Sequence, residues 1–178
     1  TLYGRAFKEE KMTEEAQLPQ QPSINVLTQF IRDMSFENIL ARNGNDGGTS
    51  PAVKINVNLE ALNKSTPQHY EIIVKLNITS KSKESGDTLF LLELEYSGIF
   101  KISGVPEKQI HPLLFIECPR ILFPFLRRIV SDITRDGGFP ALNLENIDFL
   151  HLYKNEATRR KATKNDGKLG DKKPNMMN

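Results

Sequence analysis

The sequence predicts an α+β fold in which helices cover one side of a four-stranded antiparallel sheet. Four extended runs rich in β-branched and aromatic residues follow one another between residues 24 and 104. The connections between these runs are short, which favours antiparallel neighbours joined as a meander. The strongest apolar stripes with helical spacing come after the last run, so we expect helices to pack on the face that the sheet must bury.

The four runs differ in how clearly they indicate a strand. The first, INVLTQFIRDMSF (24–36), is expected to bend near Arg32 and Asp33, and a mobile loop follows in NGNDGGTSP (43–51). The second, VKINVNLE (53–60), alternates strictly between apolar and polar side chains, as a half-buried strand does. HYEIIVKLNITS (69–80) and TLFLLELEYSGIFKISG (88–104) continue this alternation, and the latter is the longest expected strand.

The main helix is predicted within CPRILFPFLRRIVSDITRDGGFP, residues 118–140. Pro124 is placed in the first turn, because its missing N–H has no intrahelical partner there. Gly137 and Gly138 are expected to end the helix, since glycine accepts the left-handed conformation just past the last turn. The apolar stripe of this helix consists of Leu122, Leu126, Ile129 and Ile133.

Two weaker helices complete the fold. A short one is expected at residues 108–117, interrupted in its first turn by Pro112. A final helix is expected at about residues 144–159, apolar at its beginning and charged at its end. The sequence therefore predicts a disordered N-terminal extension (1–22), one folded domain (23–157) and a basic disordered tail (158–178).

The charge is concentrated at the C-terminal end. Residues 154–178 carry eight Lys/Arg and three Asp/Glu, a net charge of +5, against +2 for the whole chain. A basic disordered segment can hold RNA, a ribosome or anionic lipid through release of counterions. An RNA- or ribosome-associated protein that acts through this tail is therefore an alternative function, although a solvated terminus is the simpler interpretation.

The composition argues for a cytoplasmic protein without a cofactor. Residues 1–22 lack the apolar centre of a signal peptide, and no apolar run approaches the roughly 20 residues that span a bilayer, so we expect no membrane insertion. One cysteine cannot form an internal disulfide, which agrees with a reducing compartment. The three histidines are scattered and typical nucleotide-binding and zinc motifs are absent, so no metal is expected.

Two groups of residues are candidates for catalysis. Cys118 precedes a helix and lies near Arg120, and both the helix N-terminus and a nearby cation lower the pKa of a thiol. Its sequence surroundings, LLFIECPRILF, are apolar, however, and favour a buried, unreactive thiol. Glu93 and Glu95 lie two residues apart on one strand face. A solvent-facing row is favoured over a catalytic pair, and such a row is also a good recognition surface for a basic partner. We therefore expect no enzyme, and a cysteine- or carboxylate-dependent hydrolase is the least favoured alternative.

Five segments together resemble the SecB family of bacterial export chaperones. SGIFKISG (97–104) and CPRILFPFLRRIVSDITRDGGFPALNL (118–144) are the most specific of them. The other three are RDMSFE (32–37), VKINVNL (53–59) and the IDFLHLY that follows residue 146. They occur in the same order as in the family, and the resemblance extends over nearly the whole stretch from Ile24 to Tyr153.

The resemblance implies an assembly and a function. Two protomers would pair through their sheets, and two such dimers would pack through their long helices, giving a homotetramer that is a dimer of dimers. The function implied is that of a cytoplasmic holdase, which keeps precursors of exported proteins unfolded and delivers them to the ATPase SecA. The expected partners are thus unfolded precursors, SecA and further copies of the chain, with no specific nucleic acid. The helix stripe would serve as the oligomer interface.

Two sites are carried over by position. The acidic SecA-contacting surface of the family matches Asp33, Glu37, Leu91 and Glu93. The client-binding groove of the family matches apolar positions of the second strand, the last loop and the last helix. These positions are Val53, Ile55, Val57, Leu144, Phe149, Leu152 and Tyr153.

The chain also departs from the family pattern. Family members commonly end in an acidic tail, whereas this chain ends EATRRKATKNDGKLGDKKPNMMN, which puts any contribution of the tail to SecA binding in doubt. The tryptophan often found before the second strand is absent, and Thr49 and Ser50 stand there. About three extra residues lie between Glu60 and Gly86, which is expected to lengthen a loop only.

Overall fold

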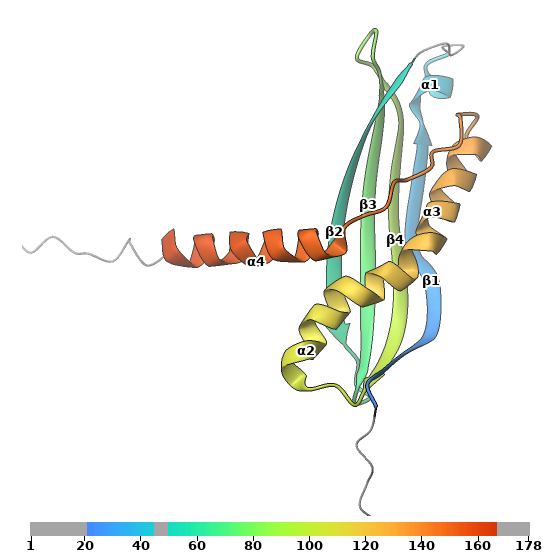
Figure 1. The fold of residues 1–178 in the computed structure, drawn as a ribbon. Helices are drawn as coiled ribbons and strands as arrows, with labels where there is room; N and C mark the ends of the chain where they lie inside the picture. Colours follow the sequence, from blue (N-terminus) through green and yellow to red (C-terminus); the bar gives the residue numbers. More distant parts are fainter. Residues whose placement is uncertain (1–20, 45–49, 167–178) are drawn as a thin grey trace, which may run out of the picture.

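A computed structural model describes residues 21–44 and 50–166, and these contain one antiparallel sheet of four strands. The strands are β1 (Ser23–Asn38), β2 (Pro51–Asn63), β3 (His69–Ser82) and β4 (Thr88–Ser103). Their order across the sheet is β1-β4-β3-β2 (Figure 1). The meander is therefore confirmed for β2, β3 and β4, but β1 lies against β4 and not against β2. Alternation of apolar residues determines which face a strand buries, and it carries no information about its neighbour.

Strand β1 is irregular where the sequence predicted a bend. Its pairing with β4 shifts register between Val26 and Thr28 and again between Ile31 and Asp33. Leu27 and Arg32 are the extra residues at these bulges, which increase the local twist of a strand. After β1, a single helical turn, α1 (Ile39–Arg42), starts at Asn38, whose side-chain oxygen accepts a hydrogen bond from the Ala41 N–H at 3.0 Å.

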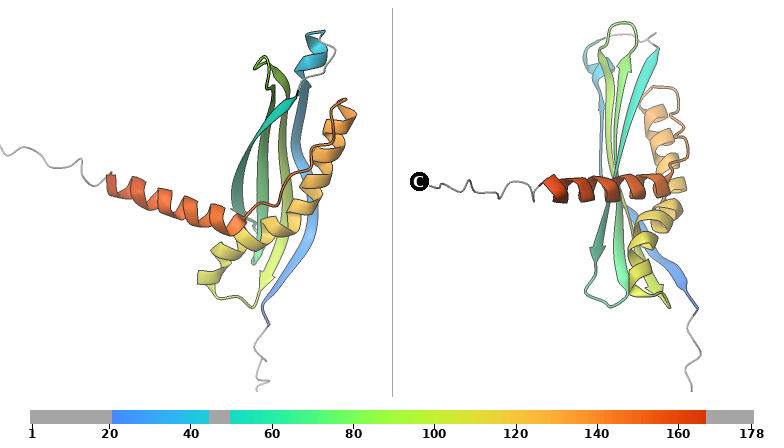
Figure 2. Two further views of the ribbon diagram at one scale, coloured as in Figure 1. Left: turned by 45° about the horizontal axis from the view of Figure 1, so that its top comes forward. Right: turned by 60° about the vertical axis from the view of Figure 1, so that its left-hand side comes forward.

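A continuous helical rod covers one face of the sheet. It consists of α2 (Glu107–Pro112), the wide turn η1 (Leu113–Glu117) and α3 (Cys118–Asp136). The turn η1 has π-helical geometry, in which each backbone hydrogen bond spans one more residue than in an α-helix. Figure 2 shows the rod on one side of the sheet in both views.

The placement of Pro124 in a first turn was wrong, because this residue lies inside α3. Its ring is on the exposed side of the helix, and the rod bends in its middle part (Figure 1). A proline in a helix interior costs about 3 kcal/mol or more. Leu122 and Phe123 before it and Leu126 after it are all buried, and burial of this stripe on both sides offsets that cost.

Helix α3 ends as the sequence predicted. Phe139 N–H donates to the Thr134 carbonyl at 3.0 Å and Gly138 N–H donates to the Arg135 carbonyl at 3.0 Å, the two bonds of a Schellman cap. Gly138, with φ of +84°, is the left-handed residue. The Gly137 carbonyl then accepts from the Asn38 side chain at 2.7 Å, which fastens the end of α3 to β1.

The last helix, α4 (Phe149–Asp166), begins later than residue 144. Asp148 accepts a hydrogen bond from the His151 N–H at 2.9 Å through its side chain, so the N-cap of the helix is Asp148 and the preceding residues form an extended connection. The helix continues through residues 158–166, where the sequence predicted a disordered tail. The remainder of that tail, 167–178, lies outside the described residues, as do residues 1–20.

The core lies between the rod and the inward face of the sheet. Every second residue of β3 and β4 points into it, and α3, Leu144 and Phe149 close it from the other side. The opposite face of the sheet is not covered by any helix of the described part of the chain (Figure 2). We call it the outer face, and its residues on β4 are the odd-numbered ones from Leu91 to Lys101.

Candidate functional site

The four residues predicted to contact SecA lie together on the outer face. Glu37 of β1 is directly opposite Leu91 of β4, and Glu93 follows two residues further along β4 on the same face. Asp33 is directly opposite Glu95, so it also points to this face. Glu37, Asp33 and Glu93 are exposed, and Leu91 is half-buried. The structure thus brings these four residues of two strands onto one face, where they form an acidic surface that includes the apolar Leu91.

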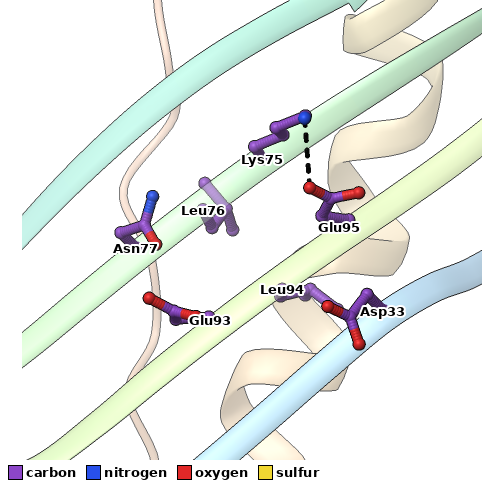
Figure 3. Close-up of a pocket in the computed structure, with 7 residues that line it drawn as sticks. All are labelled: Asp33, Lys75, Leu76, Asn77, Glu93, Leu94 and Glu95. Atoms are coloured by element: carbon purple, nitrogen blue, oxygen red, sulfur yellow. Dashed lines mark ion pairs between the residues drawn. The ribbon is translucent and has the colours of Figure 1, made fainter.

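A shallow hollow of about 80 Å³ lies in this surface. Figure 3 shows Asp33, Glu93, Glu95 and Lys75 on the near side of the strands, with Lys75 directed at Glu95. Lys75 Nζ lies 3.1 Å from Glu95 Oε1 and 3.0 Å from Glu60 Oε2. Arg32 Nε lies 3.6 Å from the other carboxylate oxygen of Glu95. Glu95 therefore has a cationic partner on both sides, whereas Glu93 has none within the described residues, so the two carboxylates lie in different surroundings.

A buried carboxylate anchors the other half of the outer face. Glu71 of β3 accepts hydrogen bonds from Lys64 Nζ at 2.9 Å, from Ser97 Oγ at 2.8 Å and from Arg32 at 3.3 Å. The hydrogen bond from Lys64 lowers the pKa of Glu71 more than burial raises it. Arg32 links this cluster to Glu95. The ion pairs therefore form one continuous network across the outer face, which begins at the β2–β3 turn and ends on strand β2.

An apolar groove runs along β2 on the inward side of the sheet. A hollow of about 430 Å³ lies between this strand and the connection that precedes α4. A second hollow continues along the strand to the first turns of α4. The lining of the first hollow includes Ile55, Val57, Leu142, Leu144 and Ile147. The lining of the second is mixed: Val57, Leu59, Phe115, Leu152 and Tyr153 are joined there by the polar or charged Asn58, Glu156 and Arg159.

Five of the seven residues predicted for the client groove line these hollows. They are Ile55, Val57, Leu144, Leu152 and Tyr153. Val53 continues the row on β2 and is 38% exposed, whereas Phe149 is 1% exposed and packs edge-on against Phe123. Phe149 therefore supports the groove from within the core. Whether these residues bind a client stays a prediction.

Sequence reasoning missed several lining residues. Leu142 and Ile147 lie in the connection between α3 and α4, of which only the part from residue 144 was expected to be helical, and Phe115 lies on η1. His111 Nδ1 is 3.0 Å from the Tyr153 hydroxyl, a contact between residues 42 positions apart that fastens α4 to α2. The only sequence signal for this contact was the spacing of His111 and Phe115, which places both on one face of a helix. This spacing could not reveal that α4 packs against that face.

The stripe predicted as an oligomer interface faces the protomer's own sheet. Leu122 and Leu126 are 0% exposed and Ile129 is 8% exposed, while Ile133 is half-buried beside them. The apolar side chains that α3 leaves exposed are Ile121 (37%) and Phe125 (40%). The interface through this helix stays a prediction, and these two residues are its better candidates.

Cys118 is buried in the core. Burial, with a smaller effect of the Glu117 charge, raises the pKa of its thiol to about 12. A thiol attacks as its thiolate, and both burial and the raised pKa disfavour the thiolate of Cys118. Among residues 21–44 and 50–166, no three His, Cys, Asp or Glu side chains are grouped so that they could hold a metal ion. No helix in the same part of the chain is long and apolar enough to cross a membrane.

An apolar groove and an acidic surface on one small sheet are typical of a protein that binds other chains. Comparison with known proteins shows the family to which the chain belongs. Residues 17–160 match the family model of the preprotein translocase subunit SecB. The protein-export protein SecB of Ruegeria sp. (strain TM1040) is 62% identical over 145 residues, 80% of this chain and 88% of the relative. That of Roseobacter denitrificans is 58% identical over 158 residues, 89% and 95% of the two chains.

A solved structure has the same fold. It is a SecB-like chaperone of Mycobacterium tuberculosis, in complex with a ChAD peptide from the HigA1 antitoxin. The two structures superpose with a TM-score of 0.59 at 12% identity, over 70% of this chain and 90% of the other. The chain belongs to the SecB family and is a protein-export chaperone. This membership favours export over the RNA- or ribosome-associated alternative.

Proposed function

We propose that the protein is a cytoplasmic holdase that keeps precursors of exported proteins unfolded and delivers them to SecA, without catalysing a reaction itself. The observation that carries this proposal is the apolar groove that runs along β2. Two hollows share Val57, so an extended chain can pass from one into the next. Burial of apolar groups is non-directional, and a groove of this kind binds exposed side chains without requiring a sequence.

The position of β2 suits an extended client. It is an edge strand, so its outward backbone N–H and C=O groups have no partner strand in the described chain. Val53 and Ile55 on this strand are exposed by 38% and 40%. An unfolded segment could therefore add main-chain hydrogen bonds to apolar contacts, as in strand addition. A long client would contact several grooves of one oligomer, and weak contacts would combine into useful avidity.

The outer face is proposed as the surface for SecA. Asp33, Glu37 and Glu93 place three exposed carboxylates on two adjacent strands beside Leu91. Complementary charge would steer a basic segment of SecA to this surface and fix its position. The surface is on the opposite side of the sheet from the groove, so a client and SecA could bind at the same time.

Self-assembly into a dimer of dimers is proposed on the basis of the exposed apolar residues. Strand β1 is the other edge of the sheet and exposes Val26, Leu27, Phe30, Ile31 and Met34. An apolar edge strand of this length is a site where another chain is expected to pair. Exposed Ile121 and Phe125 on α3 supply a second contact, so that sheets would join two protomers and helices would join two dimers.

The SecA assignment can be tested by calorimetry with the full chain and purified SecA at low ionic strength. Reversal of charge in an Asp33→Lys, Glu93→Lys variant is expected to weaken binding about tenfold or more, because attraction becomes repulsion. A Glu84→Lys, Asp136→Lys variant changes the net charge equally at exposed positions elsewhere and should bind as the wild type does. Equal loss in both variants, or no loss in either, would reject this surface as the SecA site.

A further inference from the structure

Lys75 is the one cation that lines the outer-face hollow within the described chain. The other charged residues of its lining are Asp33, Glu93 and Glu95 (Figure 3). Lys75, Glu95 and Asp33 stand side by side on β3, β4 and β1, because Lys75 is registered opposite Glu95 and Glu95 opposite Asp33. Like charges directly opposite each other are unfavourable, so a lysine beside Glu95 relieves the repulsion between the two carboxylates.

The contacts of Lys75 hold it in place. Its Nζ bridges Glu60 and Glu95 at 3.0 and 3.1 Å, from the two strands that flank β3. The hydrogen bond to Glu60, followed by that to Glu95, raises the pKa of Lys75, because both carboxylates stabilise the charged form of its side chain. Arg32 occupies the second oxygen of Glu95 at 3.6 Å.

The remaining carboxylates of the hollow lack such partners. Asp33 and Glu93 form no ion pair with any residue of the described segments, whereas Glu95 forms two. The hollow is thus divided into a neutralised part at Glu95 and an open part at Asp33 and Glu93. A lysine or arginine from a partner meets uncompensated negative charge only in the open part.

We propose that Lys75 is an internal counter-ion that competes with the basic residues of a partner for Glu95, which weakens the complex and leaves Asp33 and Glu93 as the carboxylates of the hollow that the partner contacts. The inference rests on the proposed function, since it assigns a determinant of affinity at the same surface. A partner cation reaches Glu95 only by displacing Lys75. Moderate affinity suits a chaperone that must bind SecA and leave it in each delivery cycle.

The test replaces Lys75 by methionine, which keeps the aliphatic length and removes the charge. Binding of purified SecA to the full chain at low salt is expected to tighten about threefold, the effect of one unit charge at short range in water. The affinity should also fall more steeply with salt in Lys75→Met. Lys75→Arg keeps the charge and should behave as the wild type.

Two controls separate this role from a general charge effect and from a structural one. Lys101→Met removes a charge from the same strand face about 20 Å away from Glu95 and should change SecA affinity little. The gain should disappear in Lys75→Met, Glu95→Gln, because the released carboxylate is absent. A loss of sheet stability alone would weaken binding and would not steepen its salt dependence.

The outcomes decide between the proposals. Unchanged or weaker binding by Lys75→Met, or an equal gain in Lys101→Met, would overturn the counter-ion role. If the wild type does not bind SecA at all, the proposed function fails, and a decalysine peptide serves as the probe instead. Its titration, followed by the amide signals of Asp33 and Glu93, should then still give the tighter complex with Lys75→Met. Equal affinities for the peptide would overturn the inference.

Discussion

Leu122 of α3 packs directly onto Gly98 of β4. A Cβ atom added at Gly98 would lie 2.7 Å from Leu122 Cδ2 and 2.8 Å from the ring of Phe100, closer than carbon atoms approach. This contact gives a physical reason for the glycine within SGIFKISG. The rod can reach the sheet at this point only because β4 carries no side chain there, and the position of the rod in turn determines where the groove and α4 lie.

Gly98→Ala is expected to destabilise the protein by about 1–3 kcal/mol, the usual cost of overpacking a filled core. Chemical denaturation of the variant measures this difference. Shortening the opposing side chain in Gly98→Ala, Leu122→Val should recover part of the loss, because Leu122 supplies two of the three atoms nearest to the added Cβ and Phe100 the third. A Gly98→Ala protein as stable as the wild type would contradict the close approach.

The Glu71 cluster predicts a specific dependence of stability on pH. Lys64, Ser97 and Arg32 hold the pKa of Glu71 below its usual value of 4.5, so the unfolded chain binds the proton more readily. The stabilisation is complete above about pH 4.5 and is lost as the pH falls through the lower, folded-state pKa. Glu71→Gln should lower the free energy of unfolding by about 1–3 kcal/mol at neutral pH, since it removes the charge of a carboxylate that accepts three hydrogen bonds.

The measurement is the free energy of unfolding of both proteins between neutral and strongly acidic pH. The difference between the wild type and Glu71→Gln is expected to shrink as the pH falls below 4.5. Glu84→Gln, at an exposed turn, is the control and should match the wild type throughout. A difference that stays constant over the whole range would show that ionisation of Glu71 does not contribute.

Cys118 is expected to be chemically silent in the folded protein. With its thiol pKa raised to about 12 and its side chain buried, iodoacetamide at about pH 8 should not modify it. The same reagent should modify the chain fully in guanidinium chloride, which provides the control. Rapid modification of the native protein would show that Cys118 is accessible and would restore it as a candidate nucleophile.

Much of the fold could be predicted because each element has a local signal. The alternation in VKINVNLE lies within β2, and the two glycines after Asp136 end α3. Pro124 misled the prediction because tertiary burial on both sides of it outweighs a local rule. Asp148 caps α4 where the apolar pattern alone suggested an earlier start, since periodicity does not distinguish a buried loop from a helix.

The candidate site was predictable only where a resemblance supplied the positions. Asp33 and Glu93 come from strands that are far apart in sequence, and only the order β1-β4 brings them together. The role of Lys75 as a partner of Glu95 could not be found from the sequence, because it depends on the register between β3 and β4. Likewise, the contact of His111 with Tyr153 depends on where α4 begins.

The most direct test of the holdase is the refolding rate of a chemically unfolded precursor after dilution into the full chain. When the chaperone is present at about ten times its dissociation constant, refolding should slow about tenfold, because only the free precursor folds. Val53→Ser, Ile55→Ser should lose most of this effect, and Leu150→Ser, at an exposed position outside the groove, should keep it. A precursor that refolds at its own rate in the presence of the wild-type protein would contradict the proposed function.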